Sequence, residues 1–282
     1  MAQYESTYAG AQIDAAVSDA ELLRYEKDTE GIDFSKNYLS FLALESGTFK
    51  FTNAINYSIY GVDFDWHSLA ANTNTPTVSA GQRICFKANI TPQPYAGSGK
   101  FSSTGKYIAE GNIMSLIYGG NFRDKSNFPN EAPYAGLMGM FQNNTKLVSA
   151  KNLILPAKVV YEGGYNSMFQ GCTSLIQAPK ELPATTLGQF CYNSMFQGCT
   201  SLIQAPDILA TTDEASFGSM FAYCASLKRV IIRLSKLTQG YHKNWLEGVS
   251  EHGVVIVSST IDGVPFESPN GVPHGWSIAT YN

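Results

Sequence analysis

The stretch YNSMFQGCTSLIQAP occupies residues 165–179 and recurs without change at residues 192–206, an offset of 27 residues. A degenerate copy follows at residues 219–227, and an earlier copy precedes the pair at residues 140–147. A fixed period of this length is typical of a solenoid, in which each unit completes its core only by stacking on its neighbours. The outer copies diverge, as expected for end units that face solvent on one side. We therefore predict a solenoid in which the four recognisable copies of the repeat form four coils.

Each repeat contains apolar residues spaced for burial. Met168, Cys172 and Leu175 stand at positions i, i+4 and i+7, the spacing of one face of a short helix. Residues 175–178 then read as a short strand, which Pro179 ends. The pattern predicts one helix and one strand per coil, with the apolar side chains in the core.

The cysteines follow the repeat. Three of the five, Cys172, Cys199 and Cys224, occupy matching positions in successive copies. Their total is odd and none lies in a Cys-x-x-Cys arrangement, so we expect small core residues and not a disulfide framework, a zinc site or a redox site.

The region before the repeats has a different character. Within residues 36–111, short aromatic and aliphatic runs such as 38–44, 48–52 and 83–88 are separated by turn signals, which predicts a β-sandwich. The whole chain is therefore expected to be mixed α/β and β-rich, with the β-sandwich at 36–111 followed by the solenoid at 112–239.

The two ends are expected to have supporting roles. Residues 1–35 contain a short amphipathic helix, marked by Ile13, Val17, Ala20 and Leu23, and a linker, which suits docking or oligomerisation. Residues 240–282 contain one apolar run at 254–257 and are expected to close the solenoid as a C-terminal cap.

Composition excludes several classes of partner. The 282 residues carry a net charge of −4 with scattered Lys and Arg, which provides no basic stripe for nucleic acid. No apolar stretch reaches the ~18 residues of a membrane span, and the first residues lack the pattern of a signal peptide. We expect neither nucleic-acid binding, nor membrane insertion, nor export through a signal peptide.

The repeats carry a family resemblance. Together with GNIMSLIYG at residues 111–119 and GVPHGW at residues 271–276, their MFxGCTSL core resembles the BspA-like leucine-rich-repeat surface proteins associated with Bacteroides. The β-module before the repeats is similar to the β-sandwich of such chains. The resemblance implies a leucine-rich-repeat solenoid and an adhesion or surface-recognition role, without a shared set of catalytic residues and without a cofactor.

A second resemblance lies at the N-terminus. YAGAQIDAAV at residues 8–17 is similar to a segment often found on structural and tail-fibre proteins of gut bacteriophages. With the missing signal peptide, it implies a virion structural protein, a fibre or fibre-associated appendage subunit that assembles in the host cytoplasm. Its N-terminal segment would attach to other virion proteins, and its repeats would bind a host-surface glycan or protein. A homotrimer is expected because fibres are symmetric.

Two main alternatives to the fibre hypothesis remain open, with a polysaccharide depolymerase as a remote third. One is a cell-surface or secreted leucine-rich-repeat adhesin of Bacteroides, located on the bacterial surface. The other is a virion decoration protein that binds no receptor.

No enzyme is predicted. GSGK at residues 97–100 lacks the remaining positions of a phosphate-binding loop and reads as a turn. Asp63, Asp65 and His67 could form a shallow cation site but fit a polar hairpin better. Nucleophile motifs and the paired acids of polysaccharide cleavage were not found.

Three histidines near the C-terminus are candidate metal ligands by residue type. His242, His252 and His274 lack the close spacing of a zinc helix motif. No metal site is therefore predicted, and likewise no cofactor.

Repeated polar and aromatic residues form the one candidate binding surface. If successive copies stack in register, these side chains would make a ladder suited to an extended ligand. The alternative is that the tyrosines pack in the core and the glutamines are merely solvated. The candidate residues are Tyr165, Gln170, Gln177, Tyr192, Gln197, Gln204 and Tyr223.

Overall fold

The computed structural model describes residues 19–60, 65–91, 100–129, 136–211, 216–234, 242–258 and 271–281. The chain divides into two units, Met1–Asp33 and Phe34–Asn282. In the first unit, helix α1 spans Asp19–Asp28. Leu22 and Tyr25, three residues apart on one helix face, are buried, whereas Leu23 is 58% exposed. The prediction that Leu23 belongs to the buried face was therefore wrong, and Ile13 and Val17 lie outside the described residues.

The second unit is β-rich, with a β-solenoid of about four turns in its C-terminal part. Its elements, in chain order, are η1 (Phe34–Lys36), β1 (Leu39–Ala43), β2 (Phe49–Phe51), β3 (Ile55–Ile59), β4 (His67–Leu69), β5 (Arg83–Lys87), β6 (Phe101–Ser103), β7 (Tyr107–Asn112), α2 (Ser115–Tyr118), η2 (Gly119–Asn121), β8 (Leu147–Ile154), β9 (Val159–Val160), β10 (Glu181–Leu182), β11 (Thr186–Leu187), β12 (Gln204–Ile208), β13 (Arg229–Ile232), β14 (Gly253–Ser258) and β15 (Trp276–Tyr281).

The first part of this unit is built around an aromatic core. A six-stranded sheet has the order β4-β3-β5-β1-β7-β8, and β2 pairs separately with β6. Phe41 on β1 lies with its ring centroid 5.2 Å from Phe49 on β2 and 4.9 Å from Phe101 on β6. The sheet and the β2–β6 pair therefore share a buried layer of aromatic side chains, because these short strands are rich in Phe.

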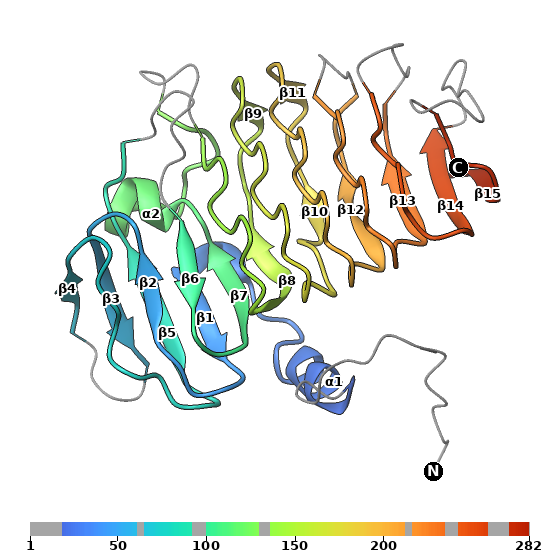
Figure 1. Ribbon diagram of the computed structural model, residues 1–282. Helices are drawn as coiled ribbons and strands as arrows, with labels where there is room; N and C mark the ends of the chain where they lie inside the picture. The colour runs from blue at the N-terminus through green and yellow to red at the C-terminus, as the bar shows by residue number, and fades with distance from the viewer. Residues whose placement is uncertain are drawn as a thin grey trace. The chain divides into compact units, whose positions relative to one another are not determined.

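Strand β8 continues this sheet into the solenoid. Strand β7 pairs antiparallel with β1, whereas β8 pairs parallel with β7. Parallel bridges then join Ser149 to Gln177 and Gln177 to Gln204, and β12, β13, β14 and β15 follow in parallel. Figure 1 shows these strands side by side along one face of the coils. The 27-residue period thus becomes one strand position per coil.

The repeat turn is not helical, so the prediction of a short helix was wrong. Ser167, Ser194 and Ser219 have φ of 53°, 52° and 51°, which an α-helix cannot contain. The backbone bonds between coils instead: the N–H of Phe169 donates to the carbonyl of Met195 at 2.8 Å. Met168, Cys172 and Leu175 are nevertheless all fully buried, as their spacing indicated.

The same turn occurs once more after the copies seen in the sequence. Asn244 and Gly248 repeat the left-handed backbone, with φ of 57° and 64°. The N–H of Phe221 donates to the carbonyl of Trp245 at 2.9 Å, as the N–H of Phe196 donates to the carbonyl of Met220 one coil earlier. Trp245 takes the place of the repeat methionine and is buried. The segment assigned to a cap therefore begins with a further copy of the repeat turn.

Ladders of identical side chains fill the solenoid. Phe141, Phe169, Phe196 and Phe221 stack nearly parallel, with successive ring centroids 5.3, 5.2 and 5.5 Å apart. In a second ladder, each repeat cysteine donates its Sγ–H to a phenylalanine carbonyl of the preceding coil, at 2.9, 3.1 and 3.0 Å for Cys172, Cys199 and Cys224. Exact stacking of equal residues fixes the register between coils.

Candidate functional site

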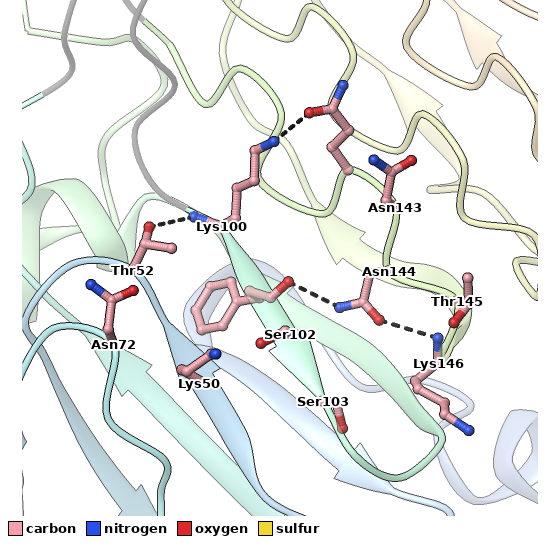
Figure 2. A pocket seen from close by; sticks show the side chains of 12 residues that line it. Lys50, Thr52, Asn72, Lys100, Ser102, Ser103, Asn143, Asn144, Thr145 and Lys146 are labelled. Carbon is pink, nitrogen blue, oxygen red and sulfur yellow. Dashed lines mark hydrogen bonds between the residues drawn. The ribbon is translucent and has the colours of Figure 1, made fainter.

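A hollow of about 290 Å³ lies where the β2–β6 pair meets the first repeat turn (Figure 2). Its walls come from segments that are far apart in the sequence. The residues that line it are Lys50, Thr52, Asn72, Lys100, Phe101, Ser102, Ser103, Gln142, Asn143, Asn144, Thr145 and Lys146.

The charge of the lining is entirely positive. Lys50, Lys100 and Lys146 contribute ammonium groups, and the lining includes no carboxylate. Within the described part of the chain, none of the three lysines forms an ion pair. The hollow therefore concentrates uncompensated positive charge on a protein whose net charge is −4.

The walls of the hollow are fixed by internal hydrogen bonds. The buried amide of Asn144 donates to the Phe101 carbonyl at 3.2 Å and to the Tyr107 hydroxyl at 2.7 Å. Its Oδ1 accepts from the Lys146 backbone N–H at 3.2 Å. On the other side, Thr52 Oγ1 accepts from the Lys100 N–H at 2.8 Å. Figure 2 shows the contacts of Asn144 with Phe101 and Lys146 and that of Thr52 with Lys100, which hold the walls of the hollow in place.

A line of amide side chains leads away from the hollow along the turns of the solenoid. Lys100 Nζ donates to Gln142 Oε1 at 2.5 Å, and Gln142 Nε2 donates to Gln170 Oε1. Gln170 Nε2 in turn donates to Gln197 Oε1 at 2.6 Å. The next coil has Ala222 at the equivalent position, so the line ends there. We call Gln142, Gln170 and Gln197 the amide ladder.

The amide ladder keeps spare hydrogen-bonding capacity. A primary amide has two N–H donors and two acceptor lone pairs on its oxygen. Gln170, in the middle, uses one N–H and one lone pair within the ladder. All three glutamines are partly exposed. Each can therefore offer at least one donor and one acceptor, already oriented, to a ligand.

The residues predicted as one ladder occupy three different places. Tyr165 and Tyr192 stack with their ring centroids 6.3 Å apart, but they are 1% and 0% exposed and belong to the core. Burial raises the pKa of both hydroxyls. These two tyrosines therefore cannot contact a ligand. For them the alternative is correct that the repeat tyrosines pack in the core.

The remaining predicted residues lie at the surface. Gln170 and Gln197 belong to the amide ladder, whereas Gln177 accepts from Ser149 Oγ at 2.8 Å on the sheet face. Gln204 is exposed on β12, and Tyr223 is half exposed. The structure therefore pairs Gln170 with Gln197 in the turn and, through a parallel bridge, Gln177 with Gln204 on the sheet, but it does not unite the predicted residues in one surface.

Sequence reasoning missed the lysines and Gln142. Gln142 precedes Gln170 by 28 residues, the offset of the first copy, so the alignment of repeats could have found it. The lysines could not be found in this way, because they come from β2, from the residue before β6 and from the loop before β8.

The other residues weighed for chemistry do not form a site in the described ranges. Residues 97–99 and Asp63 lie outside those ranges. Asp65 is exposed, and the His67 ring contacts Tyr57 at a centroid distance of 5.4 Å. In the described residues, no three or more His, Cys, Asp or Glu side chains cluster in a way that could hold a metal ion.

The C-terminal histidines are also separate. His242 is buried against Phe217, with the two ring centroids 5.8 Å apart. His252 and His274 are exposed. The five cysteines are free thiols. Burial raises the pKa of Cys172 to about 12, so this thiol is a poor nucleophile near neutral pH.

Comparison with protein-family models, with curated proteins and with solved structures finds no match. Among the residues placed by the structure, no helix is long and apolar enough to cross a bilayer.

Proposed function

We propose that the chain is a non-catalytic binding protein that recognises an extended ligand on a host cell surface. The observation that carries this proposal is the continuity of the hollow with the amide ladder, through Lys100 and Gln142. Together they form one polar strip that crosses three successive turns. A long ligand can contact such a strip at several equivalent points.

The rigidity of the coils favours this role. The amide ladder is attached to turns whose interiors are stacked phenylalanines, including Phe169, which is fully buried. A preformed surface loses little conformational entropy on binding, so modest contacts suffice. Several copies on one particle would raise the overall affinity further.

We infer further that the solenoid is of the leucine-rich-repeat type and that the module before it is a β-sandwich. The 27-residue period falls within the roughly 20 to 29 residues of leucine-rich repeats. One parallel strand position per coil is consistent with that class. For the module, the aromatic layer between the six-stranded sheet and the β2–β6 pair supports two packed layers.

We propose a virion appendage, a fibre or fibre-associated subunit, as the place of this binding activity. Support comes from the resemblance of residues 8–17, which lie outside the described residues, to segments of gut-phage fibre proteins. In this arrangement the N-terminal unit attaches the chain to other virion proteins, as a homotrimer, and the solenoid projects outward.

The location can be tested by immunogold electron microscopy of purified phage particles, using an antibody against residues 112–282. Label on a fibre or other appendage is the expected result. Unlabelled particles, with label instead on intact uninfected bacteria, would establish the cell-surface adhesin. If wild-type particles are labelled but particles that lack this protein adsorb normally, the chain would be a decoration protein without a receptor.

A further inference from the structure

We propose that the hollow binds the anionic group, a carboxylate or a sulfate, of an acidic polysaccharide, and that the amide ladder binds the sugar units that follow. This inference rests on the proposed binding function and names the chemical class of its ligand. The residues that provide the positive charge are Lys50, Lys100 and Lys146.

The charge distribution carries the first step. The protein as a whole is acidic, with 23 Asp and Glu against 19 Lys and Arg, so three lysines around one hollow depart from the average. Among the described residues, the only side-chain partner of Lys100 Nζ is the neutral amide of Gln142, which leaves its charge uncompensated. An anion in the hollow would meet ammonium groups without competition from a lining carboxylate.

The uncharged lining favours a sugar as the carrier of that anion. Thr52, Ser102 and Thr145 are exposed hydroxyl residues in the lining, and Asn143 adds an exposed amide. Such groups exchange hydrogen bonds with sugar hydroxyls, because each can donate and accept.

Nucleic acid fits the same surface less well. Phe101 is the one aromatic residue of the lining, and it is 2% exposed, so bases have no ring on which to stack. The amide ladder adds no positive charge beyond the hollow. A backbone with a phosphate at every nucleotide would therefore be neutralised only at one end.

The spacing of the coils supports a polymer over a single anionic sugar. Phenylalanine rings in successive turns lie 5.3 and 5.2 Å apart from Phe141 to Phe196, which measures the advance per coil. This advance is close to that of one sugar unit along an extended polysaccharide. Gln142, Gln170 and Gln197 can therefore meet successive units in the same way.

The test compares binding of the intact chain to three immobilised polymers. Hyaluronan carries only carboxylates, dextran sulfate carries only sulfates, and dextran is neutral. We expect tight binding to at least one acidic polymer and weak binding to dextran. The variant K50Q/K100Q/K146Q should bind that acidic polymer about tenfold more weakly, or about 1.4 kcal/mol.

A matched control removes the same charge elsewhere. Lys158, Lys180 and Lys228 are exposed and do not line the hollow. K158Q/K180Q/K228Q should bind as the wild-type chain does. Circular dichroism of both variants checks that they are folded.

Three outcomes would overturn the inference: no preference of the wild-type chain for either acidic polymer, an equal loss in both triple variants, or competition by duplex DNA at the same concentration as the acidic polymer. These outcomes are separate from those of the proposed function. A chain that labels the appendage and binds host cells, but fails this test, keeps its binding role and loses this ligand.

Discussion

Replacing Phe196 with alanine should test whether the coils stack in the register described above. Phe196 is fully buried, and its ring lies between those of Phe169 and Phe221, at centroid distances of 5.2 and 5.5 Å. The substitution opens a cavity in the middle of the ladder. Neighbouring coils cannot close that cavity easily, because inter-coil backbone hydrogen bonds hold them at a fixed spacing.

The expected loss of unfolding free energy follows from two contributions. Truncation of a buried phenylalanine to alanine costs about 3 to 5 kcal/mol through lost burial and the cavity that remains. Stacked aromatic pairs add about 0.5 to 1.5 kcal/mol each beyond their burial, and Phe196 takes part in two of them. Because the coils resist collapse, we expect a value near the upper end, about 5 kcal/mol.

Urea denaturation followed by circular dichroism and tryptophan fluorescence measures this loss. The matched control is Phe190→Ala, because Phe190 is 44% exposed and belongs to the same coil. It should cost less than about 1 kcal/mol. A loss below about 1 kcal/mol for Phe196→Ala, equal to that of the control, would refute the stacked ladder.

Three further predictions concern the backbone, the thiols and an ion pair with a buried carboxylate. Gly198→Ala should reduce the unfolding free energy measured by urea denaturation by about 1 to 2 kcal/mol, because φ is +73° although the added Cβ has room. Gly171→Ala, at φ +72°, should cost a similar amount, because the Asn143 oxygen 2.3 Å from the added Cβ is the end of an exposed side chain that can move. Cys172 has its pKa raised from 9.0 to about 12 by burial, so the native state keeps its proton where the unfolded state loses it, and the thermal midpoint should fall as pH rises above about 9. Reaction of the Cys172 thiol with a thiol reagent at pH 8 should be slow until the chain unfolds. Glu110→Gln should cost about 1 to 2 kcal/mol in urea denaturation, because it removes the buried carboxylate that lies 2.6 Å from Arg83 Nε, while the Arg83 side chain is 36% exposed and water can solvate its charge.

The repeat made the solenoid predictable, but not the conformation of its turn. Identity of two fifteen-residue stretches leaves little choice other than stacked equal units, and the burial of Met168, Cys172 and Leu175 followed from their spacing. The same spacing also suits a helix, and only the left-handed φ of Ser167 separates the two conformations. Serine rarely adopts that conformation, so its presence there could not be anticipated from residue preferences.

The candidate site was predictable only in the part that repeats. Gln170 and Gln197 recur with the period and were expected to align. The lysines of the hollow do not recur, and they meet because β2 and β6 pair and then pack beside the first turn. Contacts between segments that lie far apart in the sequence depend on tertiary packing. A single sequence contains no periodic signal for such contacts.

The amide ladder also has a direction, and this limits how a ligand can bind. Each donor belongs to the earlier residue, from Lys100 to Gln142, then to Gln170 and Gln197. An ammonium group at the start polarises the amides that follow, and a chain of hydrogen bonds is stronger when its members polarise one another in one sense. A polymer with its anionic group in the hollow would therefore meet amides that are all oriented alike. Because Ala222 ends the ladder, only the units opposite three glutamines would gain these contacts, and lengthening the polymer further should add little affinity.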